Sequence, residues 1–86
     1  MMYVRPVTDD EQIELKRMTR QAPGRVSQRA QMILLSAQRR TVSEIATIVD
    51  LSRATVRFWI RQFETAGPVG LYDHPRALRR LEYPYG

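Results

Sequence analysis

The chain has 86 residues, of which 43% are hydrophobic and 27% charged, and its formal net charge is +5. It contains no cysteine, which excludes a disulfide framework and a thiolate metal site, and the length allows a single small domain. The longest apolar run, Met32–Leu35, is far shorter than the roughly 20 residues that span a bilayer, so we expect a cytoplasmic protein with no membrane segment.

The basic residues are concentrated in the body of the chain. Thirteen of the fourteen are arginines, and Lys16 is the single lysine. Residues 1–15 hold one arginine against four acidic residues, whereas residues 16–80 hold thirteen basic against four acidic residues. Arginine suits planar, bidentate recognition of phosphate and guanine. This distribution favours a polyanionic partner, with a merely solvated charged face as the alternative.

The first predicted elements are an extended arm over residues 1–7 and a helix that begins after Thr8. Thr8 and Glu11 form the pattern of a capping box, and Pro23-Gly24 ends a helix that should reach about Arg20. The expected core positions of this helix are Ile13, Leu15 and Met18.

A second helix is predicted over about residues 25–40. Its apolar residues recur at helical spacing, which indicates one buried stripe, and Arg29 lies off that stripe. The stripe consists of Val26, Ala30, Ile33, Leu34 and Ala37.

Residues 42–67 predict two further helices joined by a short turn at Asp50-Leu51. Ser43 is the expected cap of a short helix over 44–49, and Ser52 caps a longer helix that ends at Ala66. The longer helix has an apolar side formed by Val56, Trp59, Ile60 and Phe63. Its opposite side carries Arg53, Ala54, Arg57 and Arg61.

The whole pattern predicts an all-α helical bundle of about four helices. We divide the chain into an arm (1–7), a helical domain (8–67) and a basic tail (68–86), with a short helical turn near residues 76–81.

Two helices, a short turn and a basic outer face on the second helix are typical of a helix-turn-helix. Numbered from Val42, the positions that must be apolar or small are filled by Ile45, Ala46, Val49, Leu51, Val56 and Trp59. The ninth position, often glycine, is Asp50, a residue type that tolerates positive φ better than most. An ordinary helical hairpin in a three-helix bundle is the alternative.

On this interpretation, Arg53 and Arg57 are the candidates for reading guanine in the major groove, and Arg61 is expected on the phosphate backbone. Phe58 also lies toward the outer side, where it could contact a thymine methyl group, be partly buried or lie at an interface. The candidate DNA-binding residues are Thr41, Ser43, Ser52, Arg53, Ala54, Thr55, Arg57, Arg61, Arg76, Arg79 and Arg80.

Three motifs also resemble a known family. They are R-x-x-Q-R-A-x-x-I-L-L-x-A (25–37), the segment from Ser43 to Phe63, and G-L-x-D-x-P-R (70–76). Together they are similar to the N-terminal helix-turn-helix region of mariner-type bacterial insertion-sequence transposases and related regulators. The resemblance implies a homeodomain-like fold that binds the terminal inverted repeats of a mobile element. It also implies that transposition needs an RNase H-like catalytic domain that this chain does not contain.

Other function classes remain as alternatives. Catalysis is not expected, because the single histidine, His74, has no cysteine partner and the sequence has no Gly-rich phosphate loop. We expect no cofactor, metal or small-molecule substrate. The main competing interpretation is a protein-interaction or dimerisation module. A homodimer is compatible with this interpretation and with DNA binding. RNA binding is disfavoured because no aromatic-bearing sheet is predicted.

Overall fold

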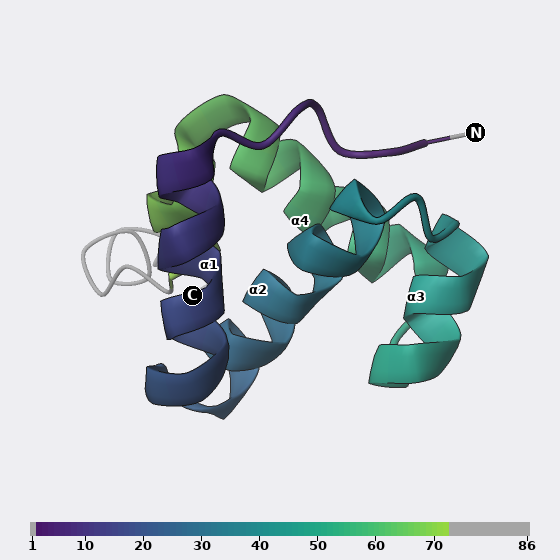
Figure 1. Ribbon diagram of the computed structural model, residues 1–86. Helices are drawn as coiled ribbons and strands as arrows, with labels where there is room; N and C mark the ends of the chain where they lie inside the picture. Colours follow the sequence, from purple (N-terminus) through teal and green to yellow (C-terminus); the bar gives the residue numbers. More distant parts are fainter. Residues whose placement is uncertain (1, 73–86) are drawn as a thin grey trace, which may run out of the picture.

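The computed structural model describes residues 2–72, and every structural statement below concerns this part of the chain. The elements are α1 (Asp9–Gln21), α2 (Gly24–Ala37), α3 (Val42–Val49), α4 (Arg53–Ala66) and the short 3-10 helix η1 (Gly67–Leu71) (Figure 1). The predicted all-α bundle of about four helices is confirmed. Among residues 2–72, the structure contains no candidate membrane-spanning helix. The helical turn predicted near residues 76–81 lies outside the described residues.

The helices begin where hydroxyl side chains can cap them. Thr8 and Glu11 form the predicted capping box of α1, and the Ser52 hydroxyl accepts a hydrogen bond from the Thr55 amide at the start of α4. The predicted cap of α3 is wrong. Thr41, not Ser43, caps α3, through a second capping box in which Glu44 accepts from the Thr41 amide. The spacing of Thr41 and Glu44 repeats that of Thr8 and Glu11.

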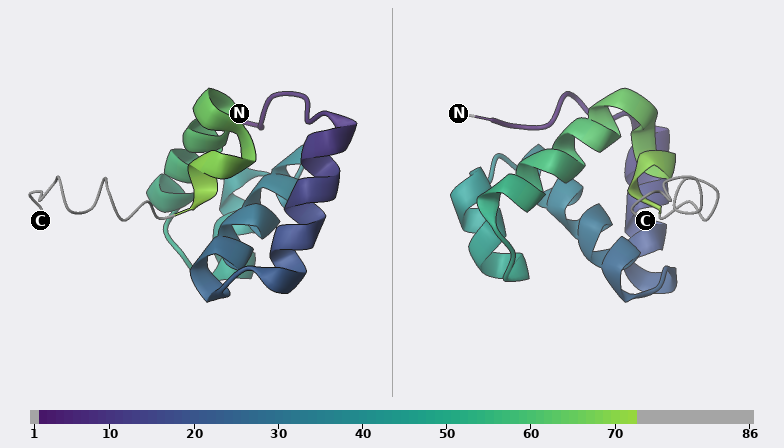
Figure 2. Two further views of the ribbon diagram at one scale, coloured as in Figure 1. Left: turned by 90° about the vertical axis from the view of Figure 1, so that its left-hand side faces the viewer. Right: turned by 180° about the vertical axis from the view of Figure 1, so that it is seen from behind.

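Helix α2 is the central element of the bundle. It packs against α1 on one side and α3 on the other, while α4 crosses behind it from α3 toward the start of α1 (Figures 1 and 2). Because other helices pack around α2, more of its surface is buried than the predicted stripe. Its buried residues are Val26, Arg29, Ala30, Met32, Ile33 and Ser36.

Several expected core positions are corrected by the structure. Ile13 is 67% exposed and Leu51 is 38% exposed, so neither belongs to the core, and Ala37 is exposed as well. Trp59 is only half-buried and packs against the edge of the core. Arg29, predicted to lie off the buried stripe, is 6% exposed. Periodicity located the helices, but it could not tell which flank of each apolar stripe a neighbouring helix covers.

The ordered core continues beyond residue 67, where the sequence placed the start of a tail. Leu71 in η1 is fully buried, and its carbonyl oxygen accepts a hydrogen bond from the Arg29 guanidinium at 2.9 Å. Gly70 allows this approach, because a Cβ atom there would lie 2.7 Å from the Gln62 carbonyl oxygen of α4.

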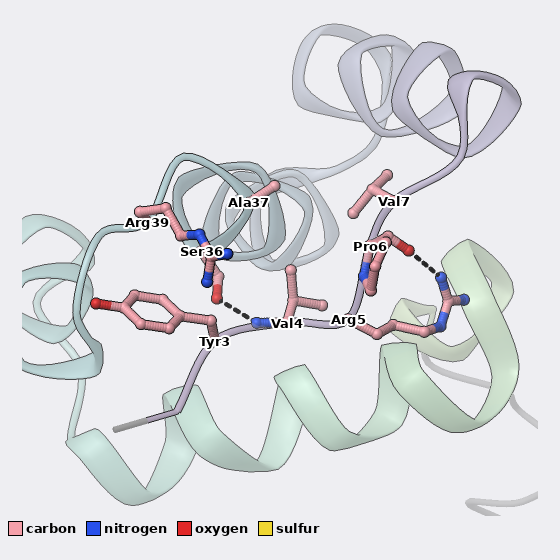
Figure 3. A pocket seen from close by; sticks show the side chains of 8 residues that line it. All are labelled: Tyr3, Val4, Arg5, Pro6, Val7, Ser36, Ala37 and Arg39. Atoms are coloured by element: carbon pink, nitrogen blue, oxygen red, sulfur yellow. Dashed lines mark hydrogen bonds between the residues drawn. The ribbon is translucent and has the colours of Figure 1, made fainter.

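The N-terminal arm is extended, as expected, and lies between the C-terminal end of α2 and helix α4 (Figure 3). Val4 is 9% exposed, and its amide donates to the buried Ser36 hydroxyl at 2.8 Å. The Arg5 amide donates to the Glu64 carboxylate of α4. The arm is therefore a packed part of the domain.

Candidate nucleic-acid interface

A tight turn joins α3 to α4. Asp50 adopts the left-handed conformation, with φ 60° and ψ 47°, and its amide donates to the Ala46 carbonyl oxygen. The Leu51 amide donates to the same oxygen at 3.0 Å. Asp50 thus takes the positive φ that glycine often supplies in this turn.

The buried faces of α3 and α4 determine which side of α4 faces solvent. Ile45 of α3 and Val56 and Ile60 of α4 are fully buried. Ala46 is 8% exposed, and its small side chain suits the close approach of the two helices. With Val56, Ile60 and Phe63 directed inward, the opposite side of α4 faces solvent along its length.

Of the predicted arginines, Arg61 lies on that side, and Arg53 and Arg57 lie on the flank between it and the buried face. Arg53, Ala54 and Arg61 are exposed, and Arg57 is half-buried. Arg53, Arg57 and Arg61 follow each other at four-residue spacing and so lie on one flank of the helix. Within residues 2–72, none of these three guanidinium groups has a hydrogen bond, an ion pair or a ring contact.

Other arginines are held by the protein itself. Arg5 makes a two-pronged ion pair with Glu11 and lies 4.7 Å from the centre of the Phe63 ring. The hydrogen bonds from Arg5, followed by that from the Thr8 amide, lower the pKa of the Glu11 carboxyl to about 2. Arg17 pairs with Glu14.

The remaining candidates are placed differently from one another. Ser43, Ser52 and Arg53 line a shallow hollow between α3 and the start of α4. The Thr41 hydroxyl is used in the cap of α3, and Thr55 is half-buried. Arg76, Arg79 and Arg80 lie outside the described residues.

Two further residues at or beside this hollow are not among the predicted candidates. Thr47 is exposed and lines it, one helical turn after Ser43, and its hydroxyl donates to the Ser43 carbonyl oxygen. Arg40 is exposed and lines a neighbouring hollow with Ser43 and Thr47. The i, i+4 spacing of Ser43 and Thr47 was the available signal.

Comparison with known proteins agrees with this geometry. The family model described as a helix-turn-helix domain matches residues 28–79, which include α3, the turn and α4. No curated protein and no solved structure matches the chain. The chain belongs to the helix-turn-helix domain family.

Proposed function

We propose that this domain binds double-stranded DNA sequence-specifically by inserting α4 into the major groove. The observation that carries the proposal is the exposed flank of α4, where Arg53, Arg57 and Arg61 have no partner among residues 2–72. The second helix of a helix-turn-helix is the element that typically enters the groove, N-terminal residues first. Unpaired guanidinium groups on that helix suit guanine edges and phosphates.

The residues have different roles in this proposal. Arg53 and Arg57, nearest the N-terminus of α4, read guanine, and the small Ala54 in the same turn allows close approach to the bases. Arg61, one turn farther along, contacts a phosphate. The remaining candidates, expected on the sugar-phosphate backbone, are Thr41, Ser43, Ser52, Thr55, Arg76, Arg79 and Arg80.

We further propose that the domain is of the transposase or transcriptional-regulator type. The support is the resemblance of residues 25–37, 43–63 and 70–76 to mariner-type transposases, and the homeodomain-like arrangement belongs to the same proposal. The chain would act by binding, without catalysis or cofactor. Within residues 2–72, no group of three or more histidine, cysteine or acidic side chains could hold a metal ion.

A protein-interaction module is the second candidate. The observation that favours it is a set of exposed apolar side chains outside α4, of which Ile13 on α1 and Val69 on η1 are the most exposed, at 67% and 54%. These residues would serve a partner surface independently of the arginines on α4.

The proposal is tested by incubating the domain with a random-sequence duplex pool, sequencing the bound fraction, and measuring fluorescence anisotropy at several salt concentrations. We expect an enriched motif, with an affinity that falls steeply as salt rises because counterions are released from the phosphates. A palindromic motif would indicate a homodimer on two half-sites. Salt-sensitive binding without an enriched motif would contradict sequence specificity. An absence of binding at low salt would contradict DNA binding itself.

A further inference from the structure

One aromatic side chain on α4 is exposed although the other large apolar residues of the helix are buried or half-buried. Phe58 is 49% exposed, whereas Ile60 and Phe63 are fully buried and Trp59 is half-buried. Exposure of a large aromatic ring disfavours it as a core residue. Its position places it opposite the buried Ile60 and Phe63, on the same outer side of α4 as Arg61.

The position of the Phe58 ring is supported by the neighbouring Trp59. It meets the Trp59 ring edge to face, with the ring centres 4.8 Å apart and the planes at 84°. The Trp59 ring in turn lies 3.9 Å from the Arg29 guanidinium, which donates to the Leu71 carbonyl oxygen. Arg29 is buried, so the stack is anchored in the core and presents Phe58 in a defined direction.

Helical geometry places this ring beside the proposed reading residues. Successive residues are turned by about 100° around the axis, so Ala54 and Arg61 lie nearly in one line along the helix. Arg57 and Phe58 then lie on opposite sides of that line. If α4 enters the major groove with this line toward the bases, the Arg57 guanidinium lies toward one side of the groove and the Phe58 ring toward the other.

We propose that Phe58 recognises the C5-methyl group of a thymine in the major groove. The methyl group is the apolar feature that distinguishes thymine there, and apolar side chains recognise it by contact. This inference rests on the proposed DNA binding. The arginine flank beside Phe58, without internal partners among the described residues, favours DNA over a second protein as the occupant of this surface.

The test replaces each thymine of the selected duplex, one at a time, by deoxyuridine, which lacks the methyl group and keeps the base-pairing edge. We expect one position at which the wild-type protein binds about fourfold more weakly, as for the loss of one buried methyl group. Phe58→Ala should bind the thymine and deoxyuridine duplexes equally at that position. Phe58→Leu should retain part of the discrimination.

The matched control is Ile13→Ala, which truncates an exposed apolar residue on α1, and thermal melts establish that each variant is folded. Ile13→Ala should keep the full fourfold effect. The proposal is overturned if no thymine substitution weakens the wild-type protein, if Phe58→Ala keeps the wild-type ratio, or if the selected site lacks thymine. Analytical ultracentrifugation of the wild-type protein and of Phe58→Ala tests whether the ring lies at a subunit interface. It would be assigned to such an interface if the variant loses a dimer that the wild type forms and still discriminates thymine from deoxyuridine. Failure to enrich any motif would instead be failure of the proposed function.

Discussion

Arginine has opposite roles in two regions of this domain, the region where the arm and η1 pack and the outer surface of α4. Where the arm and η1 pack on the helices, arginines are bound internally: Arg5 to Glu11 and Arg29 to the Leu71 carbonyl oxygen. On α4, Arg53, Arg57 and Arg61 lack partners among the described residues. A high arginine content therefore does not by itself identify a binding surface. The arginines that hold the fold must first be separated from those that are available to a ligand.

The difference can be tested because each group predicts a different phenotype. Substitution of an internally bound arginine should change the free energy of unfolding and spare the DNA-sequence preference of the variants that fold. Substitution of an arginine on the exposed flank of α4 should change the DNA-sequence preference and leave the free energy of unfolding nearly unchanged.

The largest expected effect is that of Arg29→Ala. The substitution leaves a buried carbonyl oxygen of η1 without its donor and removes the cation from the Trp59 ring, which should lower the free energy of unfolding by about 3 kcal/mol. Urea denaturation followed by circular dichroism measures this loss. Arg25→Ala, an exposed change in the same helix, should stay within about 0.5 kcal/mol of wild type. Equal stabilities for the two variants would contradict a structural role for Arg29.

Arg57→Ala should weaken binding to the selected duplex by about 1–3 kcal/mol and relax the preference at one base pair. Its free energy of unfolding should change little, because no described residue pairs with its guanidinium group. Arg61→Ala is the comparison on the same helix, and it should weaken binding to all sequences evenly. Equal losses on specific and random DNA for Arg57→Ala would remove it from base readout.

The ion pair of Arg5 and Glu11 predicts an acid-sensitive contribution to stability. The pKa of Glu11 is lowered from its ordinary value of 4.5 to about 2 in the fold, so its contribution is complete above pH 4.5 and is lost as the pH falls toward 2. Because the pair is partly exposed, we expect about 1 kcal/mol or less. Unfolding free energies at pH 6 and pH 3 should differ more for wild type than for Glu11→Gln. The same pH dependence in both proteins would assign the effect to other carboxyl groups.

The smallest effect is expected for the exposed pair of Arg17 and Glu14 on α1. Both side chains are more than one third exposed, so solvent screens the attraction, and Arg17→Ala should lower the free energy of unfolding only slightly. Thermal melts at low and high salt would measure it. A large, salt-independent loss would show that Arg17 acts through packing.

The helices and the turn could be predicted from local sequence, because capping residues, Gly-Pro signals and apolar spacing act over a few residues. Thr8, Ser52 and Asp50 behave as their local chemistry predicts. Arg29 could not be placed in this way. Its burial depends on Leu71, 42 residues away, whose carbonyl oxygen is its partner. For the same reason the sequence assigned Leu71 to a tail, since nothing near it in the chain shows that η1 folds back onto α4.

The candidate site was predictable in part. The exposure of Arg61 follows from helical spacing against the buried Val56 and Ile60, and that relation is local. Arg53, seven residues before Ile60, lies near the buried face by the same spacing, and only the structure shows that it is exposed. The hollow that brings Ser43, Thr47 and Arg53 together depends on the crossing of α3 and α4, which only the three-dimensional structure supplies.

The most direct test of DNA recognition through α4 compares two double variants of equal net charge. Arg53→Ala with Arg57→Ala removes two cations from α4, whereas Lys16→Ala with Arg20→Ala removes two exposed cations from α1, on the side of the molecule away from α3 (Figure 1). The measurement is the ratio of dissociation constants for random and selected duplexes at one salt concentration. We expect the α4 variant to lose this ratio and the α1 variant to keep it. An equal loss of the ratio in both variants would show that net charge, and not the exposed flank of α4, governs DNA recognition. A wild-type ratio in both would exclude Arg53 and Arg57 from base readout.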